Sequence, residues 1–431
     1  MAATQGAQAR GAHAEAIRLL TRVVELVKLI PASDNRDVSL LAARMLRALS
    51  ISATEGYAAP GVRADHRKAE ILTERLGDRP EVMPALIAIW VTWLTSGELQ
   101  TSGRLIARLL QMVSAPMFAW FEPEARAGAG FQSLHQGDIA EARIHLERAV
   151  EGFGQRPSDQ MVSWFWPLPH DPVAITKTGL ACVSNLEGKA AEAQRWEQEA
   201  NGRAESVGFP SRPISLAFIK GYGAWGRRLL GDITAMRALG AEIVAIGQEH
   251  GSTYWERLGS LYVGAPSLDL DPDPEFVEGT IGFLRAMGHE ALIASDLAYV
   301  AKLRAHAGRT DLAVETIESA IQVVHSSGER LHLPELLRLR ALYGGLLVPG
   351  ERRRAVDLLE ALQVAESQHS NLVALRVATD LARLPERERP ENWQQQLMRA
   401  RNRFPPTARY PELTEAESLS TADASKTSDA L

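Results

Sequence analysis

Three short motifs in the sequence carry residue types that could hold a ligand. The segment GYGAWG has the G-x-G-x-x-G spacing of a dinucleotide-binding turn, with glycines at Gly221, Gly223 and Gly226. That site needs a strand before the glycines, a helix after them and an acidic residue about 20 positions further on. The neighbouring residues follow a helical repeat instead, so we interpret these glycines as close contacts between helices.

The other two motifs resemble metal sites, and each lacks a required ligand. DLDPDPE begins like a calcium loop at Asp269, but its sixth and twelfth positions hold Pro274 and Thr280, where that loop needs glycine and glutamate. The zinc pattern H-E-x-x-H begins at His289 but ends on isoleucine, so the second histidine ligand is missing. We therefore expect no metal, no cofactor and no catalytic residue in this chain.

The segment SWFWPLPHDP is the strongest local candidate for contact with a partner. It holds Trp164, Phe165 and Trp166 in a row, followed by His170 and Asp171. An exposed aromatic cluster is typical of an interaction hot spot, whereas a loop that covers the protein core would use the same side chains for packing. A third hypothesis is an enzyme with unrecorded chemistry, which predicts that titratable side chains in this region converge in a pocket.

The composition indicates a folded helical protein without a strong electrostatic partner. Of the 431 residues, 45% are hydrophobic and 23% are charged, and the formal net charge is only -6. This charge gives no case for binding nucleic acid or a membrane surface. Cys182 is the single cysteine, and we interpret it as a small buried hydrophobe in a reducing compartment, the cytoplasm. No signal peptide or stretch of ~18 apolar residues is present.

One phrase recurs along the chain: a glycine, a short polar step, Glu-Ala or a close variant, and then an amphipathic helix. The copies begin at Gly11, Gly97, Gly137, Gly188, Gly231, Gly308 and Gly350. Neighbouring copies stand 40 residues apart from Gly97 to Gly137 and 42 apart from Gly308 to Gly350. Such self-similarity predicts a repeat architecture.

The residues of the phrase predict a helix, a tight turn and a second helix. Glycine ends the first helix because it adopts the left-handed conformation without strain at Cβ. Small alanines five and twelve positions later let two helices approach closely, with larger residues such as Leu146 and Ile317 packing between them. The alanine pairs are Ala142 with Ala149, Ala193 with Ala200, and Ala313 with Ala320. No single unit buries its apolar face alone, so the units must stack.

We therefore predict an all-α fold, a right-handed superhelical solenoid of antiparallel helix pairs. The array spans residues 11–404, and we expect disorder in residues 1–10 and 405–431, where large apolar residues are few. Alignment on the turn glycines places further candidate contacts on the concave surface, which usually binds peptides or proteins. These candidates are Phe131, His135, Asn185, Lys302 and His306.

The repeats resemble tetratricopeptide repeats (TPRs), with Gly-Asp at the turn and alanine at the two close-contact positions, although the units are longer. The array also resembles the repeat region of bacterial regulators that carry a class III adenylate/guanylate cyclase domain, or an AAA-like ATPase and a LuxR-type DNA-binding domain. The matching segments include SGELQTSGRLIARLLQ, HDPVAITKTGLACVSNLEGK and SSGERLHLPELLRLRALYGGLL. They lie within residues 11–384.

The sequence departs from those regulators in its domains. It has no cyclase domain, no G-x-x-x-x-G-K-[ST] phosphate loop and no helix-turn-helix after residue 385. The resemblance implies that the sequence begins inside the second helix of a pair, as expected for a free-standing sensor or a piece of a larger regulator. The leading hypothesis is a non-enzymatic interaction module that binds a peptide or protein and regulates a cyclase, ATPase or transcription regulator. The alternative is a small-molecule effector sensor.

Overall fold

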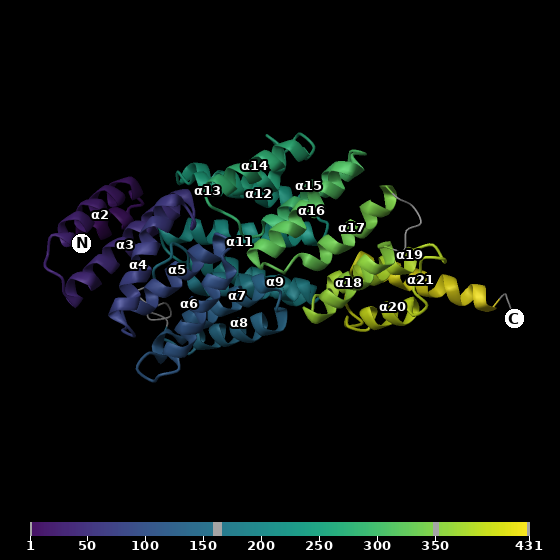
Figure 1. Cartoon of the computed structure of the whole chain (residues 1–431), viewed down its shortest axis with the longest axis horizontal. Coiled ribbons are helices and arrows are strands. Elements are labelled where there is room, and N and C mark those ends of the chain that lie inside the picture. Colours follow the sequence, from purple (N-terminus) through teal and green to yellow (C-terminus); the bar gives the residue numbers. More distant parts are fainter. Residues whose placement is uncertain (1, 158–165, 348–352, 429–431) are drawn as a thin grey trace. The chain divides into compact units, whose positions relative to one another are not determined.

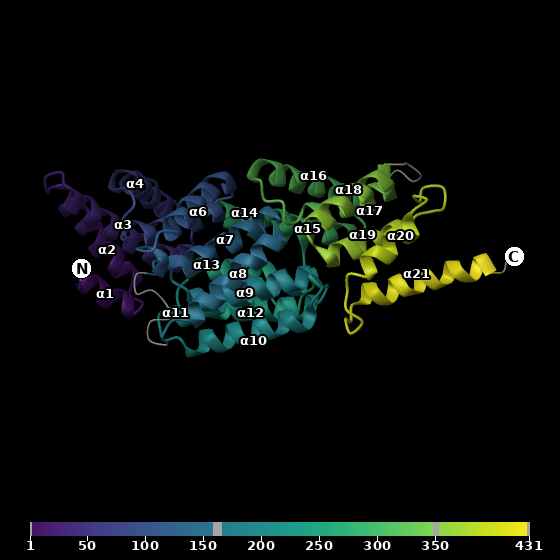
Figure 2. The same ribbon diagram turned by 90° about the horizontal axis from the view of Figure 1, so that it is seen from below.

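The structure is a computed structural model that describes residues 2–157, 166–347 and 353–428. Every secondary-structure element in these ranges is helical (Figures 1 and 2). The chain divides into two compact units. Unit 1 comprises Met1–Ser133, Glu141–Leu180 and Arg195–Ala291, and unit 2 comprises Leu134–Ala140, Ala181–Gln194 and Leu292–Leu431. The predicted all-α class is therefore confirmed for the described residues.

Unit 1 holds most of the first fourteen α-helices and one 3₁₀ helix. They are α1 (Ala2–Ala9), α2 (His13–Lys28), α3 (Asp34–Glu55), α4 (Pro60–Leu76), α5 (Val82–Thr95), α6 (Leu99–Val113), the short 3₁₀ helix η1 (Ala119–Phe121), α7 (Glu122–Gln136), α8 (Ile139–Gly154), α9 (Pro172–Leu186), α10 (Ala190–Ser206), α11 (Ser211–Leu229), α12 (Ile233–Glu249), α13 (Thr253–Val263) and α14 (Pro274–Ala286). Consecutive helices pack against each other, as α2 does with α3 and α11 with α12. The ends of α7 and α9 and the starts of α8 and α10 belong to unit 2.

Unit 2 contains the remaining helices, which pack in the same consecutive manner. They are α15 (Ile293–His306), α16 (Thr310–Ser327), α17 (Leu333–Leu347), α18 (Arg353–Ser367), α19 (Asn371–Arg383), α20 (Trp393–Arg401) and α21 (Pro411–Ser428). Among the described residues, no helix of either unit is both long and apolar enough to cross a membrane.

The glycines of the recurring phrase lie at the tight turns between paired helices. Gly137, between α7 and α8, has φ 83°, and Gly308, between α15 and α16, has φ 77°. The glycines at 11, 97, 188 and 231 also have positive φ, between 70° and 79°. These values lie in the left-handed region that favours glycine. The predicted helix–turn–helix unit is confirmed at these six turns, whereas Gly350 lies outside the described residues.

The alanines that follow each turn are buried where helices meet, as predicted. Ala142, Ala149, Ala200, Ala313 and Ala320 are fully buried, and Ala193 is almost so. Leu146 and Ile317, predicted to pack between helices, are also fully buried. A Cβ added at Gly130 of α7 would meet the Leu146 side chain of α8 at 2.5 Å, so this pair of helices has no room for a larger residue. Cys182 is a buried residue of α9.

The three glycines of GYGAWG lie inside helix α11, so the strand that a dinucleotide site requires is absent there. Gly221 leaves space, because a Cβ added there would lie 3.6 Å from Leu258, an ordinary contact. The tight approach is instead between α12 and α13. A Cβ at Gly240 would lie 2.8 Å from the amide nitrogen of Val263 and 2.9 Å from the carbonyl oxygen of Gly259.

Both ends of the sequence, where composition predicts disorder, contain helices among the described residues. Residues 2–9 form α1, in which Ala7 is fully buried, so a helix does precede the turn at Gly11. Residues 411–428 form α21, with Ala416 fully buried and Tyr410 nearly so just before it. Composition predicts disorder because large apolar residues are scarce there. Buried alanines, however, can pack a helix closely even where large apolar residues are few.

A substitution of Gly240 tests the close packing of α12 and α13. We expect Gly240→Ala to lower the free energy of unfolding by about 1–3 kcal/mol, because the new Cβ meets backbone atoms that cannot move aside. Gly279→Ala is the matched control, since Gly279 lies in α14 with nothing within 4 Å of an added Cβ. That control should be neutral or stabilising by roughly 0.5–1 kcal/mol. Urea denaturation followed by circular dichroism measures both, and equal effects would contradict the packing argument.

Candidate binding site

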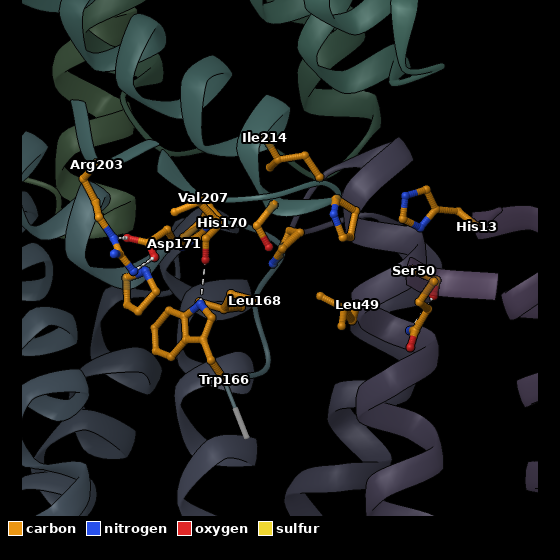
Figure 3. A pocket seen from close by; sticks show the side chains of 15 residues that line it. His13, Leu49, Ser50, Trp166, Leu168, His170, Asp171, Arg203, Val207 and Ile214 are labelled. Atoms are coloured by element: carbon orange, nitrogen blue, oxygen red, sulfur yellow. Dashed lines mark hydrogen bonds and ion pairs between the residues drawn. The ribbon is translucent and has the colours of Figure 1, made fainter. Parts of the chain in front are cut away.

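The predicted contact segment forms one wall of a cavity in unit 1. This first cavity has a volume of about 360 Å³. Residues 166–172 face the N-terminal helices and the start of α11 across it (Figure 3). Its apolar lining includes Leu49, Trp166, Leu168, Val207, Pro210 and Ile214. Its polar lining includes Gln8, His13, Ser50, His170, Asp171 and Arg203.

His170 is the most deeply buried polar side chain of this segment, with 2% of its surface exposed. Its Nδ1 lies 2.7 Å from the hydroxyl oxygen of Tyr57. Its Nε2 is buried and has no hydrogen-bond partner among the described residues. Burial lowers the pKa of His170 to about 3, so the ring is neutral at physiological pH. Burial also raises the pKa of the Tyr57 phenol well above its usual range.

Tyr57 connects the wall of the cavity to the rest of unit 1. Its carbonyl oxygen accepts a hydrogen bond from the Thr92 hydroxyl of α5 at 2.8 Å. The same hydroxyl lies 2.8 Å from Nδ1 of His66 in α4. The Tyr57 ring also packs edge-on against Tyr254 and Trp255 of α13, with centroids 6.2 and 6.4 Å away. Three helices, α4, α5 and α13, therefore position the residue that holds His170.

Trp166 and Asp171 fix the backbone of the segment on either side of His170. The half-buried Trp166 donates from Nε1 to the carbonyl oxygen of His170 at 2.7 Å (Figure 3). Asp171 caps α9, because its Oδ1 accepts from the amide of Ala174 at 2.8 Å. Both Asp171 oxygens also pair with Arg203, at 3.1 and 2.8 Å. Asp171 is therefore committed to positioning and to neutralising Arg203.

A second cavity adjoins the first one within unit 1. It has a volume of about 240 Å³ and shares His13, Pro210 and Ile214 with the first cavity. Phe209 lies on its rim with 53% of its surface exposed, which is high for a large aromatic side chain. Buried Nδ1 of His13, at the junction of the two cavities, has no hydrogen-bond partner among the described residues. The second cavity is lined by the charged side chains of Arg10 and Glu249 as well as by apolar residues. Two adjoining cavities suit an elongated ligand.

The structure brings together three of the ten predicted contact residues, Trp166, His170 and Asp171, at the first cavity. Trp164 and Phe165 lie outside the described residues. Phe131, also in unit 1, is buried in α7, with its ring centroid 5.9 Å from that of Phe218. Phe218 in turn packs against His170 at 5.1 Å. Phe131 therefore packs against Phe218, the ring that contacts His170.

The other four predicted residues belong to unit 2. His135 and Asn185 are buried. His135 Nδ1 lies 2.7 Å from Glu329 Oε1, and Glu329 also accepts from the amide of Leu292 at the start of α15. These contacts make His135 part of a buried structural cluster. Lys302 is half-buried and pairs with Glu335 at 2.7 Å, whereas His306 is exposed at the end of α15.

Several residues of the site carried no ligand-binding signal in the sequence. His13 and Arg203 line the cavity, and Tyr57 holds His170 from outside the lining. Each lies at least 30 positions from residues 163–172. Only the clustering of aromatic residues, proline, histidine and aspartate at residues 163–172 pointed to the site. That pattern located one wall, and the fold supplies the others.

Four titratable side chains line this cavity, namely His13, His170, Asp171 and Arg203. Within the described part of the chain, no three His, Cys, Asp or Glu side chains converge so that they could hold a metal ion. Nε2 of His170 contacts no hydroxyl or thiol of the described residues, so it activates no nucleophile there. Asp171 is paired with Arg203 and caps α9. The arrangement is that of a binding pocket: an apolar lining with a few polar groups.

Comparison with known proteins identifies the fold. No family model matches the chain, and no curated protein sequence matches it. Among solved structures, the chain is similar to that of a Rap protein complexed with competence and sporulation factor, with a TM-score of 0.55 and 12% identity. The match covers 85% of this chain and 98% of that one. At this identity the likeness shows a TPR-like helical-repeat fold, as predicted.

The buried histidines predict how stability depends on pH. Burial lowers the pKa of His66 to about 4 and that of His170 to about 3. Between roughly pH 6.5 and these values the unfolded chain binds protons that the folded chain does not, so stability should fall as the pH falls. Each histidine contributes on the order of a few kcal/mol across that range.

Thermal unfolding at pH 7, 6 and 5 measures this loss. His66→Asn keeps a donor for the Thr92 hydroxyl but does not titrate, so its unfolding temperature should decline less with acid than that of the wild type. His325→Gln, which removes an exposed histidine of α16, should leave the pH slope unchanged. If the unfolding temperature of His66→Asn fell with acid as steeply as that of the wild type, a lowered pKa of His66 would not account for the loss of stability.

Proposed function

We propose that this chain is a non-enzymatic interaction module of bacterial signal transduction that binds a peptide or a short protein segment on unit 1. The observation that carries the proposal is the first cavity, where Trp166 and His170 face an apolar lining within a TPR-like fold. Repeat arrays of this kind generally present surfaces to peptides and proteins. A cavity with an aromatic wall supplies the pocket in which such a partner anchors a side chain.

The likeness to the Rap complex supports this proposal through the fold. That protein was solved with competence and sporulation factor bound, so a fold of this type can hold such a factor. We further propose, on the sequence resemblance to bacterial regulators, that occupancy is passed to a cyclase, an ATPase or a transcription regulator. On unit 2, exposed His306 and half-buried Lys302 are proposed as additional partner contacts.

A small-molecule effector is the alternative occupant. The volume of the first cavity, about 360 Å³, falls in the range of small-ligand pockets, ~300–1,000 Å³. The adjoining second cavity favours a longer ligand instead, because the two hollows share three lining residues. A thermal-shift screen against a metabolite set separates the alternatives, since a small effector should raise the unfolding temperature by itself.

A peptide-display experiment tests the proposed function. The full chain is panned against a random-peptide library, and the enriched peptides are synthesised and titrated by calorimetry. We expect Trp166→Ala to weaken their binding by roughly 10-fold or more, as for an interface hot spot. Trp120→Ala, which removes a partly exposed tryptophan of η1 outside the cavity, should leave the affinity unchanged.

Two outcomes would contradict the proposal. The first is a library that yields no peptide binding better than its scrambled version. The second is an enriched peptide that binds wild type and Trp166→Ala equally while both proteins keep the same circular dichroism spectrum.

A further inference from the structure

The inference begins with His170, which lines the first cavity and whose buried Nε2 lacks a partner among the described residues. His170 is 2% exposed, and this nitrogen has no hydrogen-bond partner among the described residues. The other ring nitrogen, Nδ1, is held by the Tyr57 hydroxyl at 2.7 Å. A buried polar group without a partner is unfavourable, and native structures rarely tolerate one without a functional reason. A ligand in the cavity would supply the missing partner.

The hydrogen bond to Tyr57 decides whether Nε2 donates or accepts. Burial keeps both the Tyr57 phenol and the His170 ring neutral. The phenol has one proton to donate, and His170 Nδ1 is its hydrogen-bond partner among the described residues. If the phenol donates to Nδ1, the single proton of the neutral ring must sit on Nε2. His170, a lining residue of the cavity, therefore carries an N–H donor without a partner, and a ligand that reaches this atom needs an acceptor.

The charges around the cavity favour a neutral acceptor over a carboxylate. Arg203, the cation of the lining, is paired through two nitrogens with Asp171, so their charges cancel. His13 is also drawn towards its neutral form, because burial lowers its pKa. A carboxylate entering this mostly apolar space would lose water without gaining a counter-charge, whereas an amide carbonyl would not carry that cost.

The second cavity extends the site in one direction. It shares His13, Pro210 and Ile214 with the first cavity and adds an apolar rim at Phe209. An extended peptide presents side chains at regular intervals with amide groups between them, which matches two adjoining cavities that share His13. The second cavity combines apolar residues such as Phe209 with the charged side chains of Arg10 and Glu249. A compact small molecule would fill only one of the two hollows.

We propose that unit 1 binds an extended peptide whose backbone carbonyl accepts a hydrogen bond from Nε2–H of His170, and whose apolar side chains occupy the two adjoining cavities. This proposal rests on the proposed peptide-binding function and adds the chemistry of recognition. In this proposal His170 donates a hydrogen bond to the peptide backbone, and Trp166 and Leu168 form the apolar wall beside it. Phe209 packs on the peptide side chain that enters the second cavity.

The first test is a direct reading of the His170 proton by ¹⁵N NMR on histidine-labelled full-length protein. We expect the apo ring to be neutral with its proton on Nε2, and Tyr57→Phe to change this tautomer. Three probes then share one phenylpropyl body: 3-phenylpropanamide, 3-phenylpropionate and 3-phenylpropylamine. The amide should shift the Nε2 resonance with an affinity on the order of 1 mM, as expected for so small a ligand. The carboxylate and the amine should bind at least about 5-fold more weakly.

Paired variants separate recognition from folding. His170→Asn can accept the Tyr57 hydrogen bond but does not reach the position of Nε2, so it should lose at least about 5-fold in affinity for the amide. His170→Gln reaches that position with its own amide and should retain more of the binding, despite losing the Tyr57 contact. For the second cavity, N-acetyl-leucyl-leucine methylamide should bind more tightly than N-acetyl-leucine methylamide. Phe209→Ala should abolish that difference without changing the binding of 3-phenylpropanamide.

Three results would overturn the proposal: an apo His170 with its proton on Nδ1, a preference for the amine or the carboxylate over the amide, or equal amide binding by wild type and His170→Asn. Failure of the proposed function is a separate result. In that case no library peptide depends on Trp166, although the amide probe still shifts His170. Conversely, a Trp166-dependent peptide that leaves the Nε2 resonance unmoved would support the module and refute this mode of recognition.

Discussion

The Tyr57 hydroxyl and Nδ1 of His170 form a hydrogen bond across 113 residues of sequence, buried from solvent. Tyr57 follows α3, contacts α5 through Thr92 and packs on α13. His170 lies just before α9, in a segment that Trp166 and Arg203 hold from either side. Because both partners are buried, neither can rotate away without leaving a polar atom unpaired. The position of the cavity wall and the protonation of His170 both depend on this contact.

The repeat could be predicted from sequence because its determinants are local. A glycine at a helix end, an acidic or polar start to the next helix and alanines at fixed distances act within one helix pair. The observed positive φ at Gly137 and Gly308 and the burial of Ala142 and Ala313 are therefore what those residue types require. Consecutive helices pack against each other in each unit, so a pattern in the sequence translates directly into a contact.

The candidate site could be predicted only in part. The aromatic and proline-rich segment marked one wall, but His13, Tyr57 and Arg203 reach that wall through the folding of the chain, which no short motif encodes. Alignment on the turn glycines placed His135 and Asn185 at the concave surface. It did not predict that both are buried or that His135 pairs with Glu329. Composition likewise did not indicate the helices at the two ends, in which Ala7 and Ala416 are buried.

The walls of the first cavity come from parts of the chain that are far apart: residues before 51, residues 166–172 and residues 203–214. In a helical-repeat protein most contacts are between neighbours, and separate regions can open independently with their own free energies. An occupant touching all three walls would act as a reversible cross-link, stabilising only the closed form of each. With the cavity occupied, α1–α3 and the start of α11 would therefore open together rather than one at a time. Ligand binding would make their opening cooperative. A partner that recognises the ordered form of either element would then sense the ligand without touching it.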